Sequence, residues 1–171
     1  MNKAEYVQMR IFAPDFKMPC KLDDRYSYIE ISEYSHENDL LKIIDSINKT
    51  LSDWKDRPDI DNLKKRFDVG CSCFIQYFKG EVCGWFWTCD FLTYDWVEKV
   101  KDLPTPNSNY SGGTYVIKKV APRNAGYQLY AHCIQKVMSR TDYGYAYVDK
   151  WNKAPIRLNF NCGATYVDNL L

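Results

Sequence analysis

The segment covering residues 114–137 is the part of the chain whose residue types and order could bind a phosphate group. It reads TYVIKKVAPRNAGYQLYAHCIQKV, a β-type run that ends near Pro122 and is followed closely by a helical pattern. A strand that leads through a short loop into a helix presents backbone N–H groups and the positive end of the helix dipole. The segment therefore predicts an anion site at residues 125–130. An ordinary connection between a strand and a helix has the same pattern.

Two common phosphate-binding motifs do not occur in the sequence. The chain contains neither the G-x-G-x-x-G run of dinucleotide-binding folds nor the G-x-x-x-x-G-K-[ST] run of P-loops. A phosphate site in this chain would therefore depend on the backbone amides that open the helix after Pro122.

A second segment, DKWNKAPIRLNFNCGATYV at residues 149–167, extends the pattern. Together the two segments resemble the GNAT superfamily of N-acetyltransferases, which have the acyl-CoA N-acyltransferase fold. Members carry V-x-P-x-x-R-G-x-G-x-G/A at the start of the central helix and N-x-x-A/S-x-x-L-Y-x-x-x-G-F along the last one. The resemblance covers residues 26–171. The matching positions are Val120, Pro122, Gly126, Asn152, Leu158 and Gly163.

The resemblance implies a fold and a cofactor. It implies a single α/β (α+β) domain with a mixed, mostly antiparallel sheet flanked by helices and a strand-loop-helix pyrophosphate site. Loop amides would bind the pyrophosphate of acetyl-CoA, and the pantetheine arm would lie between the fourth and fifth core strands. The residues implied to bind the cofactor are Lys118, Val120, Ala125, Gly126, Tyr127, Gln128, Leu129, Tyr130 and Asn152.

The phosphate loop departs from the family pattern. With a shifted alignment, Arg123 and Gly126 take the roles of the family's Arg and Gly. Branches that act on amino sugars and cell-surface precursors also relax this loop, which is why an amino sugar is one expected acceptor. Aligned on Pro122 without a gap, the positions of the family's Arg, second Gly and Gly/Ala carry Ala125, Gln128 and Tyr130.

Asp149 and Asn159 are the candidate catalytic residues. Asn159 stands where the family usually carries the Tyr that protonates the departing thiolate, and an amide does not titrate near neutral pH. We therefore expect no general acid from the last helix. Asp149, at the end of a predicted strand, is the best carboxylate for a base, with a solvated or capping role as the alternative. Attack of a neutral amine on a thioester needs mainly proximity, an oxyanion donor and a water route for the proton.

Hydrophobic periodicity predicts the strands that position these segments. Strands are expected at residues 6–12, 26–32, 114–120, 143–148 and 164–167. The run CSCFIQYFKGEVCGWFWTCDFL predicts a hairpin that turns at Lys79 and Gly80. Residues 101–113, rich in Pro, Asn, Ser and Gly, predict the longest loop.

Four helices are expected between these strands. Their apolar stripes are Leu40, Ile44, Ile47 and Leu51; then Ile60, Leu63 and Phe67, with a cap at Asp59 and a stop at Gly70; then Leu129, Cys133, Ile134, Val137 and Met138; and finally Ile156 and Phe160 after a cap at Asn152.

The length and the net charge of the chain limit its domain organisation and its possible partners. The 171 residues predict an N-terminal extension at residues 1–24 and one acyltransferase domain at residues 25–171. A net charge of +1 argues against nucleic acid or an anionic membrane as partner.

No apolar run reaches the length of a signal peptide or a membrane span, so a cytoplasmic location is expected. The seven cysteines lack a C-x-x-C pair and predict mostly buried thiols and no metal site.

These observations predict an enzyme that transfers an acyl group, acetyl by expectation, from acyl-CoA to the amine of a small metabolite. The alternative is a catalytically silent protein of the same fold that binds acyl-CoA or a protein partner. The strand at residues 6–12 is expected to add to the sheet, or to the sheet of a partner in a homodimer, because an exposed edge invites pairing. The alternative is a loosely ordered tail, as is common at chain termini.

Overall fold

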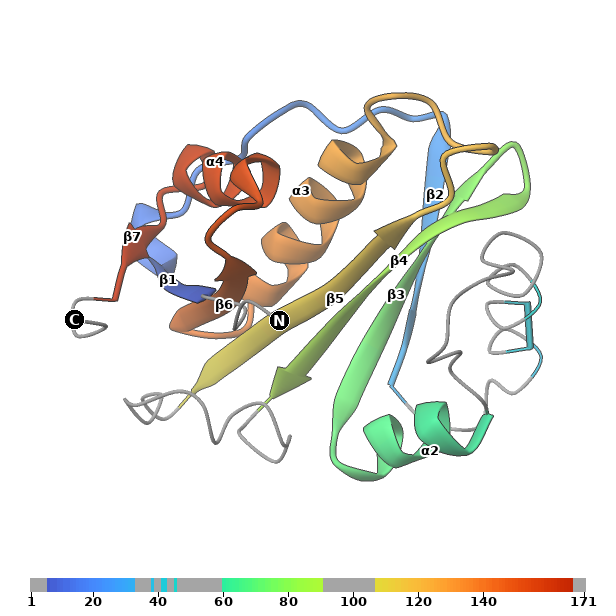
Figure 1. Ribbon diagram of the computed structural model, residues 1–171, viewed down its shortest axis with the longest axis horizontal. Helices are drawn as coiled ribbons and strands as arrows, with labels where there is room; N and C mark the ends of the chain where they lie inside the picture. Colours follow the sequence, from blue (N-terminus) through green and yellow to red (C-terminus); the bar gives the residue numbers. More distant parts are fainter. Residues whose placement is uncertain are drawn as a thin grey trace. The chain divides into compact units, whose positions relative to one another are not determined.

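The computed structural model describes residues 6–32, 60–90 and 107–167, together with residues 38, 41, 42 and 45 (Figure 1). The hydrogen-bonded strand order is β2 (Tyr26–Ile31), β3 (Cys71–Phe78), β4 (Glu81–Asp90), β5 (Ser108–Val116), β6 (Tyr143–Asp149), β1 (Tyr6–Phe12) and β7 (Thr165–Tyr166). The β2/β3, β1/β6 and β1/β7 pairs are antiparallel, and β5 and β6 are parallel. This mixed, mostly antiparallel sheet with helices confirms the predicted α/β class.

The chain divides into two compact units, and β4, β5 and α3 (Ala125–Met138) contribute residues to both. Unit 1 comprises Met1–Leu22, Cys89–Gly112 and Ala131–Leu171, and unit 2 comprises Asp23–Thr88 and Gly113–Tyr130. The predicted boundary between an extension at residues 1–24 and a domain at residues 25–171 stays a prediction.

Unit 2 contains a hairpin that the sequence predicted. Strand β3 (Cys71–Phe78) turns into β4 (Glu81–Asp90) at Lys79 and Gly80, whose φ angles are 54° and 82°. Two successive positive φ values are typical of the tight turns that match the twist of paired strands. On the other side of β3 lies β2 (Tyr26–Ile31), and α2 (Ile60–Asp68) precedes β3. Gly70, with a φ of 82°, follows the end of α2 as predicted.

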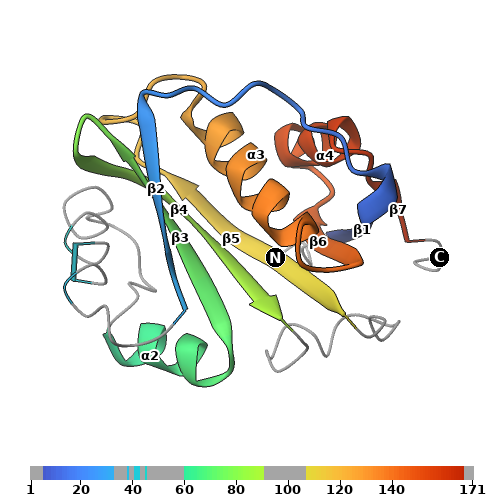
Figure 2. The ribbon, with the colours of Figure 1, turned by 180° about the vertical axis from the view of Figure 1, so that it is seen from behind.

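Unit 1 contains the N-terminal strand. Strand β1 (Tyr6–Phe12) pairs along its whole length with β6 (Tyr143–Asp149), and β7 (Thr165–Tyr166) pairs with its other edge. Figure 2 shows β7 beside β1 near the C-terminus. Met9 and Ile11 on β1 are at most 2% exposed. The expectation that this strand adds to the sheet is confirmed.

The predicted strand at residues 114–120 is wrong in its bounds. Strand β5 runs from Ser108 to Val116, so part of the predicted loop at residues 101–113 is a buried strand, while residues 101–106 lie outside the described residues. Residues 108–111 pair in parallel with residues 143–146 of β6. Small polar residues that favour loops in isolation form a strand here because a neighbouring strand satisfies their backbone groups.

The helices largely follow their predicted stripes. Strand β5 is followed by α3 (Ala125–Met138), whose predicted apolar face from Leu129 to Met138 is buried. The last helix, α4 (Lys153–Asn161), buries Ile156, but Phe160 is 42% exposed and its predicted core role is wrong. Asn159 takes the inward position, so Phe160 faces outward and packs edge-on against Tyr166, with ring centroids 5.0 Å apart. The predicted helix carrying Leu40, Ile44, Ile47 and Leu51 lies outside the described residues, apart from isolated positions.

The cysteines are free thiols, and all except Cys20 are buried, which confirms the expectation of mostly buried thiols. Among the described residues no group of three or more His, Cys, Asp or Glu side chains is placed to hold a metal ion. No described helix has both the length and the apolar character needed to cross a membrane.

Candidate functional site

Two consecutive turns connect β5 to α3. The Ile117 N–H donates to the carbonyl of Cys83 on β4 at 2.8 Å, and the carbonyl of Ile117 then accepts the N–H groups of Val120 and Ala121 at 3.0 Å. The second turn closes when the Ala125 N–H donates to the Pro122 carbonyl at 3.0 Å. Pro122 suits this place because its fixed φ favours a turn and its missing N–H leaves no donor unsatisfied.

Asn124 occupies the N-cap position of α3, but its side chain does not cap the helix. Its carbonyl accepts the Gln128 N–H at 3.0 Å, which is the first hydrogen bond of the helix. Its side-chain Oδ1 accepts the hydroxyl of Tyr26 at 2.8 Å. Among the described residues the Gly126 N–H makes no hydrogen bond. The opening turn of α3 therefore keeps a backbone donor that its cap residue could have satisfied.

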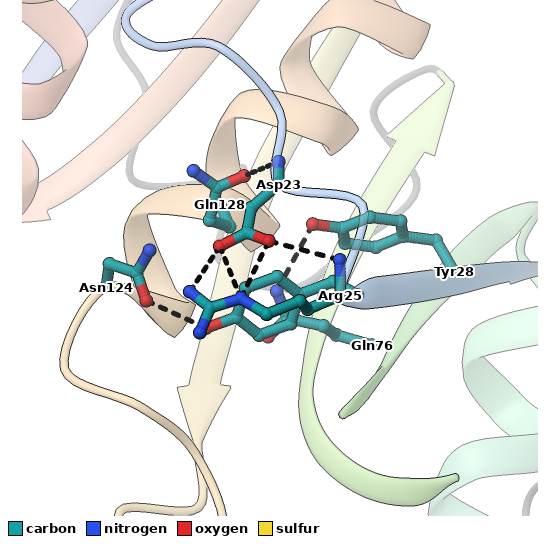
Figure 3. Close-up of polar contacts among 7 residues, drawn as sticks. Asp23, Arg25, Tyr28, Gln76, Asn124 and Gln128 are labelled. Carbon is teal, nitrogen blue, oxygen red and sulfur yellow. Dashed lines mark hydrogen bonds and ion pairs between the residues drawn. The ribbon is translucent and has the colours of Figure 1, made fainter. Parts of the chain in front are cut away.

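A short segment at residues 23–26, which we call the strap, contacts this helix start. The Asp23 N–H donates to Gln128 Oε1 at 2.8 Å, and Gln128 is only 5% exposed. Figure 3 shows the Asp23 and Arg25 pair against the side chains of Asn124 and Gln128. The side chain that replaces a family glycine at position 128 is thus held by the strap.

Asp23 and Arg25 form an exposed ion pair within the strap. The carboxylate accepts Arg25 Nε at 2.9 and 3.1 Å and the terminal guanidinium nitrogen at 2.6 Å. Hydrogen bonds from the Arg25 side chain and backbone, with a further one from Asn124, lower the pKa of Asp23 to about 2. The pair adds no net charge beside the start of α3.

Buried Gln76 on β3 anchors the first turn of α3. Its Nε2 donates to the Ala125 carbonyl at 3.1 Å and to the Tyr28 hydroxyl at 3.4 Å, and its Oε1 accepts the Cys83 thiol at 3.3 Å. Burial raises the pKa of Cys83 to about 12, so this thiol keeps its proton and acts as the donor. Gln76 thus fixes the helix start relative to the strands of unit 2.

Gly126 allows α3 to approach β5 closely. A Cβ atom at this position would lie 3.3 Å from Val116 Cγ2, closer than most such contacts. The absence of a side chain therefore serves helix packing, and it also leaves the Gly126 N–H unobstructed by a side chain of its own residue.

Three cations lie in the turn between β5 and α3. Lys118, Lys119 and Arg123 are exposed, and none forms an ion pair among the described residues. The turn IKKVAPRN contains no acidic residue. Positive side chains and a helix N-terminus act in the same direction and favour an anion.

No family model matches this chain, and no curated protein matches it in sequence. Solved structures match across most of its length. A glucosamine N-acetyltransferase region in a fungal multi-domain β-N-acetylglucosaminidase matches with a TM-score of 0.68 over 96% of this chain, at 12% identity. The chain has the GNAT fold.

Two further GNAT structures differ in how much of them the chain spans. A tandem GNAT protein from the clavulanic acid biosynthesis pathway matches at 11% identity with a TM-score of 0.63, over 97% of this chain and 51% of that one. An aminoglycoside acetyltransferase from an uncultured soil metagenomic sample matches at 12% identity with a TM-score of 0.60, over 88% of this chain and 95% of that one. The chain thus spans about half of the tandem GNAT protein and 20% of the fungal protein.

In unit 2, several of the residues predicted to bind the cofactor have buried side chains, so they can contact a ligand mainly through backbone groups. The side chains of Ala125, Gln128, Leu129 and Tyr130 are at most 5% exposed. Tyr130 packs edge-on against Phe86 with ring centroids 5.8 Å apart, so its ring lies in the core. Of the remaining predicted residues, Lys118 is exposed and Val120, Gly126 and Tyr127 are half-buried.

The predicted residues Asp149, Asn152 and Asn159 lie in unit 1. Asp149 Oδ1 accepts the Trp151 N–H at 2.9 Å, which is the turn-capping role left open by the sequence. Asn152 stands at the N-cap of α4 but makes no side-chain cap hydrogen bond. Asn159 is 2% exposed, and its Nδ2 donates to the Pro155 carbonyl at 2.9 Å. The catalytic roles of Asp149 and Asn159 and the cofactor-binding role of Asn152 stay predictions.

Sequence reasoning missed the strap and Gln76. Asp23 and Gln128 are 105 residues apart in the chain, and Tyr26 and Asn124 are 98 apart. The one available signal was Gln76, a polar residue inside the otherwise apolar run CSCFIQYF, because a buried amide needs partners.

Proposed function

We propose that this chain is an acyl-CoA-dependent N-acyltransferase that moves an acetyl group from acetyl-CoA to the amine of a small metabolite, with an amino sugar as the first acceptor class. The observation that carries the proposal is the Gly126 N–H, which is left without a hydrogen bond among the described residues at the start of α3. The GNAT fold supports the reaction class. Likeness to structures described as an aminoglycoside acetyltransferase and a glucosamine N-acetyltransferase region supports the acceptor class.

The residues around α3 fit the pyrophosphate of coenzyme A. The backbone at residues 125–130 would hold it, and Lys118, Lys119 and Arg123 would balance its charge. The strap carboxylate does not oppose this, because Asp23 is already paired with Arg25.

When bound, acetyl-CoA supplies an acetyl thioester: the amine nitrogen bonds to the carbonyl carbon, the carbon–sulfur bond breaks, and the amine proton is lost while the thiolate gains one. Asp149 is our proposed acceptor for the amine proton, since its second carboxylate oxygen makes no hydrogen bond among the described residues. Asn159 donates to a backbone carbonyl and supplies no proton. Water would protonate the thiolate.

Two variants at Gly126 test the coenzyme site. Gly126→Pro removes the N–H in the first helical turn, where proline is tolerated, and Gly126→Ala adds a Cβ at the same place but keeps the N–H. We expect the Pro variant to bind coenzyme A at least tenfold more weakly than the Ala variant, about 1.4 kcal/mol, by calorimetry. Equal affinities of the two variants for coenzyme A would show that the Gly126 N–H does not bind the coenzyme. A bulkier residue would press on Val116 and would not separate the two effects.

An activity screen tests the reaction. Release of free thiol from acetyl-CoA should require an amine, so glucosamine and an aminoglycoside should react, whereas glucose should not. Thiol release that does not depend on the acceptor's amine would contradict N-acyl transfer.

A catalytically silent protein of the same fold is the second candidate. The observations that favour it are the two catalytic candidates, because Asn159 is buried and bonded to Pro155 while Asp149 caps a turn. Coenzyme binding in calorimetry without thiol release for any amine tested would establish this candidate.

A further inference from the structure

The amide orientation of Asn124 is fixed by two partners. The Asp23 carboxylate can only accept hydrogen bonds at neutral pH, so the Asn124 NH₂ group faces it, and Oδ1 then faces the Tyr26 hydroxyl at 2.8 Å. An Asn at the N-cap ordinarily uses Oδ1 to accept the N–H of the second or third helical residue. In α3 the second residue is Gly126. The usual cap acceptor is therefore occupied by Tyr26.

The Tyr26 hydroxyl is held in place by the sheet and not by the helix. Tyr26 is 6% exposed, lies opposite Phe78 in the β2/β3 ladder, and packs on that ring with centroids 5.4 Å apart. It belongs to a buried cluster with Cys83 and Ala125. Because the ring is fixed from β2 and β3, it can hold Asn124 whether or not a ligand is bound.

We propose that Tyr26 is a positioning residue for coenzyme binding, which keeps Asn124 Oδ1 away from the amides of α3 and so leaves the Gly126 N–H open to the pyrophosphate. The identity of the ligand rests on the proposed function; the effect on the Gly126 amide does not. Residues 23–26 thus act on the site through Asn124.

Four variants separate this role from a merely structural one. Tyr26→Phe keeps the packed ring but frees Asn124, which can then cap α3 and compete with the coenzyme. We expect coenzyme A to bind about tenfold more weakly, whereas pantetheine, which lacks the pyrophosphate, should bind as before. Tyr26→Phe combined with Asn124→Ala should recover the affinity of Asn124→Ala alone. Tyr166→Phe on β7, where the ring packs against Phe160, also removes one tyrosine hydroxyl; it is the control outside unit 2 and should leave affinity unchanged.

Hydrogen exchange at the Gly126 amide gives a readout without ligand. We expect slower exchange in Tyr26→Phe than in the wild type, and exchange as in Asn124→Ala in the double variant. If the wild type does not bind coenzyme A, the proposed function is wrong. Hydrogen exchange at the Gly126 amide then still tests whether Tyr26 keeps that amide free of Asn124. Three results would overturn the positioning role of Tyr26. They are unchanged exchange of the Gly126 amide in Tyr26→Phe, equal loss of coenzyme A and pantetheine binding in that variant, and no recovery of affinity in the double variant.

Discussion

The side chain of Gln76 donates a hydrogen bond of 3.1 Å to the carbonyl oxygen of Ala125, so that a buried residue of β3 fixes the first turn of α3. The same amide group contacts the Tyr28 hydroxyl, and its oxygen accepts the Cys83 thiol. Replacing Gln76 with Met keeps the shape but leaves these buried groups without their partner. We expect a loss of about 1–3 kcal/mol in the free energy of unfolding, measured by urea denaturation.

Gln8 provides a matched control for that variant. It is also buried, at 3% exposed, but its Nε2 has no hydrogen-bond partner among the residues that the structure describes. Gln8→Met removes an unsatisfied donor and should be neutral or stabilising by the same measurement. Equal destabilisation by the two substitutions would show that shape, and not hydrogen bonding, determines the cost at Gln76.

The ion pair in the strap should be visible in the titration of Asp23. Its pKa is lowered from 3.8 to about 2, chiefly by the hydrogen bond from the Arg25 side chain. The contribution of the pair to stability is therefore present above pH 3.8 and is lost as the pH falls through 2. In Arg25→Gln, the pKa of Asp23 followed by NMR should move up toward 3.8. A value that stays near 2 would assign the shift to Asn124 and the backbone.

His132 should make stability fall at mildly acidic pH. Burial, together with Lys136, lowers its pKa from 6.5 to about 4. Between these values the unfolded chain binds a proton that the folded chain does not, so the free energy of unfolding declines as the pH drops from 6.5 toward 4. His132→Gln should flatten that decline in urea midpoints measured at pH 7 and pH 5. An unaltered slope would place its origin at other groups.

Gly163 and Gly70 follow the ends of α4 and α2 with φ angles of 90° and 82°. A Cβ at Gly163 would overlap the backbone oxygen of Asp15, whereas a Cβ at Gly70 meets no atom of the described residues within 4 Å. Gly70→Ala should therefore lower the free energy of unfolding only by the strain of alanine in the left-handed conformation, about 1–2 kcal/mol. Gly163→Ala should cost about 1–3 kcal/mol more because of overpacking. Similar melting temperatures for the two variants would contradict the contact with Asp15.

Local chemistry in the sequence predicted several elements correctly. The turn at Lys79 and Gly80, the stop at Gly70 and the buried face of α3 depend on φ preferences and on a helical period that a few neighbouring residues carry. The turn after Pro122 belongs to the same class, because proline marks it directly. Its role as a pyrophosphate site stays a prediction.

Only the tertiary structure decided where β5 begins and what occupies the cap of α3. Residues 108–111 have loop-forming types, and pairing with β6 makes them a strand. Tyr26 takes the cap acceptor of Asn124 across 98 residues of chain. The physical reason is the same in both cases: a backbone group or a side-chain amide bonds to whichever partner the fold brings within reach, and the residue types beside it in the sequence do not identify that partner.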